Sequence, residues 1–290
     1  MKTGFVAIIG RPNVGKSTII NALLERKLSI VTEKAQTTRN AIRGIYDDGD
    51  YQIVFIDTPG IHKAHHSLGK IMNQDALNSA KDVDAVILVV DASKKVNEGD
   101  VFIQESISKK IPTYIAINKI DLIRLPEAEA IKAKYHEMYP DAKIIELSAI
   151  ENFGIDTLLK EIKSILPEGP RYYPKDQVTD KDAAFFVSEV IREKLLKLLK
   201  EEVPHNLAVR VDDIKHKKEA AYIKATIIVD RDSHKGIVIG KEGRRIKAIG
   251  IKARTDLEEY FGKRIFLELF VSVKEDWINN NRILKELGYK

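Results

Sequence analysis

Apolar positions along the chain change their spacing near residue 170. Before it, short apolar runs typical of strands alternate with stretches whose apolar residues recur every three or four positions. The runs at 42–47 and 51–57 flank Asp48-Gly49-Asp50, which predicts a β-hairpin. The alternation predicts an α/β domain over 1–170, with a mostly parallel sheet, helices on both faces and one antiparallel edge strand. The expected strands are 5–9, 42–47, 51–57, 85–91, 113–118 and 143–148, and the expected helices are 16–25, 67–80, 98–109, 127–138 and 155–165.

A different order of elements follows a proline-rich segment. PEGPRYYPKDQVTDKD, residues 167–182, has three prolines and no apolar period, so we assign residues 171–182 to a linker. The order beyond it is α-β-β-α-α-β, which fits one α+β domain over 183–290. Its expected elements are a helix at 183–200, strands near 206–215 and 219–230, a short helical turn ending at Gly240, a helix at 243–261, a strand at 264–273 and a tail helix within 275–287.

Composition narrows the chemistry. The 290 residues include no cysteine, which excludes disulfides, zinc–thiolate sites and thiol catalysis and fits a reducing, cytoplasmic setting. The apolar run at 85–90 is far shorter than the ~20 residues of a membrane span. Residues 1–180 hold 24 Lys+Arg against 25 Asp+Glu, whereas 181–290 hold 24 against 18. This basic surplus favours a polyanion partner for the second domain, although a solvated basic surface would give the same count.

The early loop GRPNVGKS, residues 10–17, matches G-x-x-x-x-G-K-[ST] between a predicted strand and a predicted helix. Such a loop points its backbone N–H groups at a β-phosphate, and the helix adds the positive end of its dipole. Lys16 can bridge the β- and γ-phosphates, and the Ser17 hydroxyl can ligate Mg²⁺. The residues expected to contact the nucleotide here are Asn13, Val14, Gly15, Lys16, Ser17 and Thr18.

Three further motifs each follow a predicted strand. In DTPG, residues 57–60, Asp57 can hold Mg²⁺ through water and Gly60 lets the backbone approach a γ-phosphate. In NKID, residues 118–121, Asp121 can accept hydrogen bonds from N1–H and the 2-amino group of guanine, which adenine does not offer. The other residues expected at the base are Asn118, Lys119 along the ring face, and Ser148 and Ala149 of SAI, which could present a backbone N–H to guanine O6. Together these motifs predict GTP binding.

The threonine that would close over Mg²⁺ lies in AQTTRN, residues 35–40, before the hairpin. Thr37 and Thr38 both qualify, and we favour Thr38 because it is nearer the strand. The expected metal ligands are Ser17, Thr38 and Asp57, and the groups expected to act in hydrolysis are Lys16, Thr38 and Gly60.

Ile61 follows DTPG, where GTPases of the Ras kind place the glutamine that orients water. Isoleucine cannot hydrogen-bond water, so slow intrinsic hydrolysis and a switch or timer role are expected.

The late loop GKEG, residues 240–243, lacks both the spacing and the Ser/Thr of a second phosphate loop. It matches the G-x-x-G turn between two helices that, in a KH module, clamps about four single-stranded nucleotides. Residues 235–252 hold six Lys or Arg and one acid, Glu242. The residues expected to contact RNA are Lys235, Gly236, Ile239, Gly240, Lys241, Glu242, Gly243, Arg244, Arg245 and Lys247.

With GRPNVGKS, AQTTR, DTPG, NKID, SA, the linker and VIGKEG in this order, the whole chain resembles the Era family of bacterial GTPases, whose KH domain is of the second topological type. The resemblance implies GTP, GDP and Mg²⁺ as cofactors. It also implies binding to the 3′ end of small-subunit (16S) rRNA, a role in 30S subunit maturation, and peripheral contact with the cytoplasmic face of the inner membrane. We expect a cytoplasmic monomer. The alternative from the residues alone is a membrane-associated GTPase whose basic region binds anionic lipid.

Overall fold

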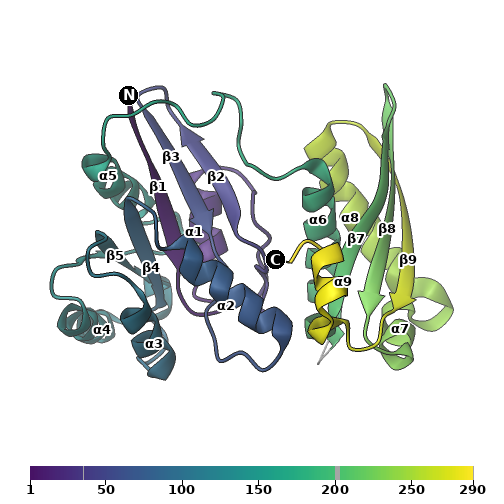
Figure 1. The fold of residues 1–290 in the computed structure, drawn as a ribbon, viewed down its shortest axis with the longest axis horizontal. Helices are drawn as coiled ribbons and strands as arrows, with labels where there is room; N and C mark the ends of the chain where they lie inside the picture. The colour runs from purple at the N-terminus through teal and green to yellow at the C-terminus, as the bar shows by residue number, and fades with distance from the viewer. Residues whose placement is uncertain (35, 200–202, 290) are drawn as a thin grey trace. The chain divides into compact units, whose positions relative to one another are not determined.

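The computed structural model describes residues 1–34, 36–199 and 203–289 (Figure 1). Residue 35, the first of AQTTRN, and residue 200, the last of the helix predicted at 183–200, lie outside the described residues. The chain divides into two compact units. The first comprises Met1–His65 and Gly69–Asp180, and the second comprises His66–Leu68 and Lys181–Lys290. No helix among the described residues is both long and apolar enough to cross a membrane.

A six-stranded sheet forms the centre of the first unit, in the order β2-β3-β1-β4-β5-β6. Every neighbouring pair is parallel except β2 and β3, so the predicted mostly parallel sheet with one antiparallel edge strand is confirmed. The strands are β1 Lys2–Ile9, β2 Ile42–Asp47, β3 Tyr51–Asp57, β4 Ala85–Asp91, β5 Thr113–Asn118 and β6 Lys143–Glu146.

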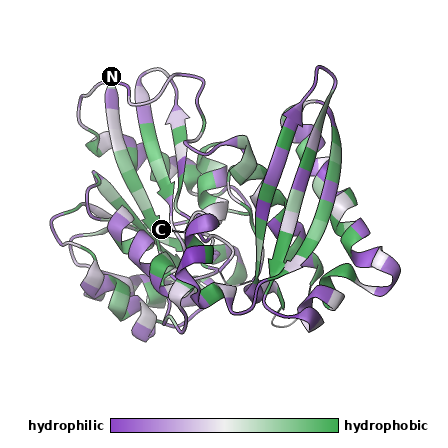
Figure 2. Cartoon of the chain, turned by 45° about the vertical axis from the view of Figure 1, so that its right-hand side comes forward, coloured by the Kyte–Doolittle hydropathy of each residue, from purple (hydrophilic) through white to green (hydrophobic). Residues whose placement is uncertain are grey.

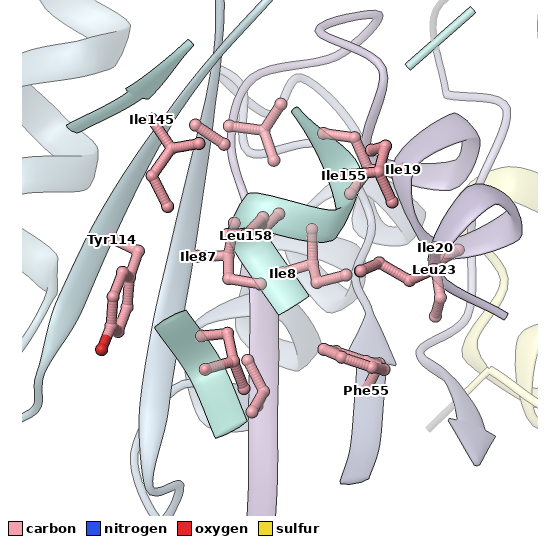
Figure 3. Close-up of a cluster of buried hydrophobic side chains, with 14 of the residues drawn as sticks. Ile8, Ile19, Ile20, Leu23, Phe55, Ile87, Tyr114, Ile145, Ile155 and Leu158 are labelled. Carbon is pink, nitrogen blue, oxygen red and sulfur yellow. The ribbon is translucent and has the colours of Figure 1, made fainter. Parts of the chain in front are cut away.

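Helices cover both faces of this sheet because its strands are apolar on both sides. Successive side chains of a strand point to opposite faces, so Ile8 packs with Ile19 of α1 and Leu158 of α5 (Figure 3), while Ile9 packs with Ile103 of α3 on the other face. The helices are α1 Lys16–Leu23, α2 Ser67–Ser79, α3 Glu98–Ser106, α4 Leu125–Met138 and α5 Ile155–Ile165, with a 3₁₀ turn, η1, at Ile120–Leu122.

The second unit has the predicted order α-β-β-α-α-β. Its three-stranded sheet has β8 in the centre, antiparallel to β7 and parallel to β9. Helices α6, α7 and α8 pack on one sheet face. Polar and apolar residues both occur along the three strands (Figure 2). The elements are α6 Ala183–Leu198, η2 Val203–Asn206, β7 Leu207–His216, β8 Ala220–Val229, α7 Asp232–Ile239, η3 Lys241–Gly243, α8 Arg244–Phe261, β9 Arg264–Val273, η4 Trp277–Asn279 and α9 Asn281–Glu286.

The tail helix begins later than 275, at Asn281. Trp277 is fully buried and its indole N–H donates to the Asn206 carbonyl oxygen at 3.2 Å. This contact holds Trp277–Asn279, the residues before α9, in a single 3₁₀ turn. The Asn280 side chain then caps α9 by accepting from the backbone N–H of Arg282.

Residues 171–180, which the sequence assigns to the linker, lie in the first unit beside the β2–β3 hairpin. The buried side chain of Gln52 accepts from the backbone N–H groups of Tyr172 at 2.7 Å and Tyr173 at 3.0 Å. It also donates to the Tyr173 carbonyl at 2.8 Å. Further along, the Ile45 N–H donates to the Val178 carbonyl at 2.9 Å, so the segment occupies part of the open edge of β2.

Replacing Gln52 with leucine should loosen this segment. Gln52→Leu leaves three backbone groups of Tyr172 and Tyr173 without their partner, at a cost of about 1–3 kcal/mol for each group that stays buried. We expect amide hydrogen exchange, measured by mass spectrometry, to accelerate at least about tenfold over 171–178. Gln74→Leu on α2 is the control, because among the described residues the Gln74 amide bonds only Asn78 of its own helix. Unchanged exchange at Tyr172 and Tyr173 would contradict the role of Gln52.

Candidate functional site

The loop at 10–17 folds around the amine of Lys16. Gly10 and Gly15 have φ values of +151° and +100°, and a Cβ at either position would collide with Val89 or Asn118, so only glycine fits. The Lys16 amine donates to the carbonyls of Gly10 at 3.1 Å and Arg11 at 2.9 Å. The loop therefore holds the positive charge of Lys16 inside its own curve.

Lys16 and Asp57 are both buried, and burial shifts both of them toward their neutral forms. Burial lowers the pKa of Lys16 from 10.5 to about 8, although the Asp57 carboxylate opposes the shift. Burial raises the pKa of Asp57, while Lys16 and the hydroxyl of Ser17 oppose that shift. A phosphate beside Lys16 would restore its charge, because a nearby anion stabilises the protonated amine.

Three predicted metal ligands meet beside this amine. The Ser17 hydroxyl lies 2.8 Å from the Thr38 hydroxyl and donates to Asp57 Oδ2 at 2.8 Å. Asp57 Oδ1 is buried and has no hydrogen-bond partner among the described residues. Two hydroxyls and a carboxylate with an unused oxygen fit Mg²⁺, which takes oxygen ligands and keeps several waters or phosphate oxygens. No group of three or more His, Cys, Asp or Glu that could hold a metal ion occurs in the described part of the chain.

The two candidate threonines differ in their contacts. Thr37 donates from its hydroxyl to the Lys34 carbonyl at 2.6 Å and lies 2.7 Å from the Thr32 hydroxyl, so it serves the turn of its own loop. Thr38 is buried against Ser17 instead. The structure thus brings Thr38 to the candidate metal site.

Asn118 joins three loops at the carboxyl ends of the strands. Its amide N–H donates to the Val14 carbonyl at 2.8 Å, and its amide oxygen accepts from the Ala149 N–H at 3.0 Å. The sequence suggested that Asn118 reaches the base and that the Ser148–Ala149 loop offers a backbone N–H to it. In the structure the Asn118 amide oxygen and the Ala149 N–H bond each other, so Asn118 also fixes the position of the loops that would contact the base.

Lys119 crosses over the phosphate loop, donating to the Asn13 carbonyl at 2.7 Å and to Asp91 Oδ2 at 2.6 Å. Asp91, which the sequence reasoning missed, lies at the carboxyl end of β4 in register with Asn118. A signal for it existed, because AVILVVD ends in an acid at the same edge as Asp57. Asp121 follows in η1 and its side chain is exposed.

The residues after Asp57 divide between the site and the core. Gly60 lies against Pro12 of the phosphate loop so closely that a Cβ would be 2.7 Å from the Pro12 backbone. Ile61 donates its N–H to the Gly10 carbonyl at 3.1 Å, and its side chain, 2 % exposed, packs in the core with Ile9 and Ala76. Ile61 is therefore a packing residue whose side chain does not orient water.

The GKEG turn lies between α7 and α8 of the second unit. Gly240, Glu242 and Gly243 have positive φ values of +72°, +53° and +72°, and Lys241 and Glu242 of the turn are exposed. Arg244 pairs with Glu242 at 2.6 Å and Arg245 donates to the Ile237 carbonyl at 2.6 Å. Of the predicted set, Lys241, Glu242, Arg244, Arg245, Lys247 and Gly236 are exposed, while Lys235, Ile239, Gly240 and Gly243 are partly exposed.

A groove of about 490 Å³ lies between α8 and β9, and its lining begins on α8 at Ile246, three residues after the turn. We call it the α8–β9 groove. Only Lys247 of its lining was predicted. The missed residues of α8 recur every three or four positions, so they form one stripe of the helix, and this spacing can be seen in the sequence. Ile251 of the stripe is an exposed apolar side chain. The lining is Tyr222, Ile246, Lys247, Gly250, Ile251, Arg254, Ile265, Phe266, Leu267, Glu268 and Leu269.

Comparisons with known proteins divide the chain in the same way. Residues 5–119 match a family described as a 50S ribosome-binding GTPase, and residues 202–278 match the KH domain family. The chain is 47 % identical to the GTPase Era of Alkaliphilus metalliredigens (strain QYMF), over 100 % of this chain and 99 % of that protein.

Two solved structures resemble the whole chain. A crystal structure of Era in complex with MgGDPNP and nucleotides 1506–1542 of 16S ribosomal RNA has a TM-score of 0.96 and 38 % identity. A point variant of Aquifex aeolicus Era bound to GDP·AlF4⁻ has a TM-score of 0.96 and 37 % identity. Each covers 100 % of this chain and 99 % of its own.

Shortening Ile61 should cost stability and spare hydrolysis. Ile61→Ala removes a buried side chain from the sheet core, and we expect the free energy of unfolding to fall by about 2–4 kcal/mol. Single-turnover hydrolysis of bound GTP should change by less than about tenfold, because no side chain that orients water is lost. Ile53→Ala, in the core of β3, is the matched control and should behave alike. A thousandfold loss with intact GTP binding would show that Ile61 acts in catalysis.

The lowered pKa of Lys16 should appear as proton uptake on nucleotide binding. Because Lys16 titrates at about 8 when folded and at 10.5 when unfolded, the nucleotide-free protein binds fewer protons than the unfolded chain between these values. Its stability therefore rises with pH across that window.

A bound phosphate raises the pKa of Lys16 again, so Lys16 should take up nearly one proton on GDP binding without Mg²⁺ at about pH 9 and contribute almost none at about pH 6, where it is already charged. Titration calorimetry in buffers of different ionisation enthalpy measures this uptake. Lys16→Arg is the control, because arginine stays charged throughout. Equal proton uptake by wild type and Lys16→Arg would rule out Lys16 as the source.

Proposed function

The chain belongs to the Era family of GTPases, and from this we propose that it is a GTP-hydrolysing switch that binds the single-stranded 3′ end of 16S rRNA in maturation of the 30S subunit. The observation that carries the GTPase half is the meeting of Ser17, Thr38 and the unpartnered oxygen of Asp57 beside the buried amine of Lys16. The observation that carries the RNA half is the exposed G-x-x-G turn at the start of α8, the helix that lines one side of the α8–β9 groove.

The residues of the first unit divide the work of GTP hydrolysis. Lys16 places its charge at the β- and γ-phosphates, and Gly60 lets the backbone come close to the γ-phosphate. Ser17, Thr38 and Asp57 would hold Mg²⁺, which supplies neutralisation of the phosphate charge when bound. Asp121 selects guanine through N1–H and the 2-amino group. With no side chain at position 61 to orient water, hydrolysis without help is slow.

The second unit offers RNA two kinds of contact. At the turn, Gly243 leaves open space, with no atom within 4 Å of where its Cβ would be, so a sugar–phosphate backbone can come close. The exposed cations Lys241, Arg244 and Lys247 lie within four residues of Gly243 along the chain and supply positive charge for phosphates. The groove beyond the turn is lined by Ile246, Gly250 and Leu269 among others, an apolar floor on which bases can lie.

A change between the GTP and GDP states can move the linker segment through β2. Thr38 lies four residues before Ile42, where β2 begins. The backbone of Ile45, within β2, holds Val178. A switch threonine that moves with the γ-phosphate therefore pulls on the strand that carries the linker segment. Coupling of this kind is reciprocal, so tighter RNA binding with GTP means tighter GTP binding with RNA.

We also propose that the protein acts in the cytoplasm as a monomer, with peripheral contact to the inner membrane. The basic surplus of residues 181–290 supports attraction to anionic headgroups. Sedimentation with phosphatidylglycerol vesicles tests the contact, and light scattering tests the monomer.

RNA binding should depend on the open space at Gly243. Gly243→Asp adds a carboxylate where the RNA backbone would pass, and we expect affinity for a 16S rRNA fragment of nucleotides 1506–1542 to fall at least about tenfold. Gly49→Asp is the control, because Gly49 also has a positive φ and open surroundings but lies in the β2–β3 turn. Equal affinities of the two variants, by fluorescence anisotropy at fixed salt, would refute the RNA site.

The same titration tests the coupling. Wild type loaded with a non-hydrolysable GTP analogue should bind this RNA more tightly than wild type loaded with GDP, by about 5- to 150-fold. Identical affinities in the two states would show that the nucleotide does not control RNA binding.

A further inference from the structure

Two exposed aromatic rings lie side by side on the second unit, at one end of its open sheet face. Tyr222 of β8 and Phe266 of β9 are in register, and their rings are stacked with centroids 4.7 Å apart and planes 10° apart. Tyr222 is 38 % exposed and Phe266 is 50 % exposed. We call these two residues the aromatic pair. Because Tyr222 covers one face of the Phe266 ring, the other face is the surface open to a ligand.

The aromatic pair is continuous with the α8–β9 groove, since both rings line it. It lies at the end of the groove far from the G-x-x-G turn. A tight turn at Gly262 joins α8 to β9, so Phe266, near the start of β9, lies toward the C-terminal half of α8. Gly243 and Arg254, which lines the groove, are separated by about 16 Å of helix at 1.5 Å per residue. A single RNA strand that binds at the turn and lies along the groove therefore reaches the aromatic pair.

Positive charge gathers at this end of the sheet, where β7 ends and both β8 and β9 begin. The ranges 215–219 and 262–266 contain Lys215, Lys217, Lys218, Lys263 and Arg264 and a single acid, Glu219. The Lys217 amine lies 4.8 Å from the centroid of the Tyr222 ring. Aromatic faces for bases beside cations for phosphates are the two components of a single-stranded nucleic-acid surface.

From this juxtaposition we propose that the aromatic pair is a base-stacking platform for RNA that extends past the nucleotides clamped at the G-x-x-G turn. The inference rests on the proposed RNA-binding function and deepens it. A base stacks on the outer face of Phe266, Tyr222 supports that ring from behind, and the surrounding lysines neutralise the adjacent phosphates. The protein therefore binds a longer single strand than the turn alone can hold.

The charge pattern of the same face favours RNA over an anionic membrane. Asp213 lies opposite Lys224 in register, and Lys224 pairs at 3.3 Å with Glu268. Acidic and basic side chains therefore alternate in the row next to the aromatic pair. These two acids would repel the anionic headgroups of a flat bilayer pressed against the row beside the aromatic pair. A single base needs only the Phe266 ring and the cations at its end of the sheet.

The test measures affinity for the 1506–1542 RNA, and for versions shortened from either end, by fluorescence anisotropy with the full chain. We expect Phe266→Ala to weaken binding of the full RNA about tenfold, within the range expected for loss of one base stack. The deficit should disappear once the nucleotides that reach the platform are removed. Phe266→Trp should bind like wild type because it keeps an aromatic face. Phe270→Ala is the matched control: Phe270 lies on the same strand and sheet face and is 52 % exposed, but it does not line the groove.

The outcomes separate this inference from the function on which it rests. Failure of wild type to bind the RNA, or normal binding by Gly243→Asp, overturns the proposed function and the platform with it. Loss of binding in Gly243→Asp with unchanged binding in Phe266→Ala, or an equal loss in Phe270→Ala, overturns the platform alone. If Phe266→Ala keeps RNA affinity but loses sedimentation with vesicles of phosphatidylglycerol and phosphatidylcholine, the surface is a lipid contact and the proposal is wrong.

Discussion

The buried amide of Asn118 is the contact on which the nucleotide site depends. A side-chain amide inside a protein must have partners for both its N–H and its oxygen, because an unpaired buried polar group costs about 1–3 kcal/mol. Asn118 finds them in the Val14 carbonyl and the Ala149 N–H, so the end of β5 is tied to the phosphate loop after β1 and to the loop after β6. Three loops from three strands thus form one rigid rim.

The two units bind phosphate by opposite means. In the first, a closed loop surrounds the Lys16 amine. Burial of this positive charge is unfavourable, and the lowered pKa of Lys16 shows that cost. In the second, the turn at 240–243 and its neighbouring cations are exposed at the surface, and the backbone at Gly240, Glu242 and Gly243 has positive φ. The closed site suits one small ligand bound with defined geometry, whereas the open one suits a polymer that extends beyond it. A switch that times the handling of RNA needs both kinds of site.

Much of this could be predicted because the signals were local. Strand and helix periods gave both domain types, and each GTPase motif stood at the end of a predicted strand, where parallel strands bring their ends together. Sequence left Thr37 and Thr38 open, because neighbours on an irregular loop have no period to separate them. It missed Asp91, whose role depends on the amine of Lys119, a residue that follows β5. It also missed most of the α8–β9 groove, since a groove forms only when the side chains of a helix and a strand are packed together.

The sequence by itself determined the two fold types, the guanine-nucleotide motifs and the G-x-x-G turn, because each follows from residue types at fixed spacing along one segment. Only the tertiary structure decided that Ile61 faces the core, that Asn118 joins the loops, that Gln52 holds the linker segment, and that Tyr222 stacks on Phe266. Each of these contacts joins residues from different segments of the chain. No local pattern specifies such contacts, because they exist only when packing brings their partners within hydrogen-bond or van der Waals distance.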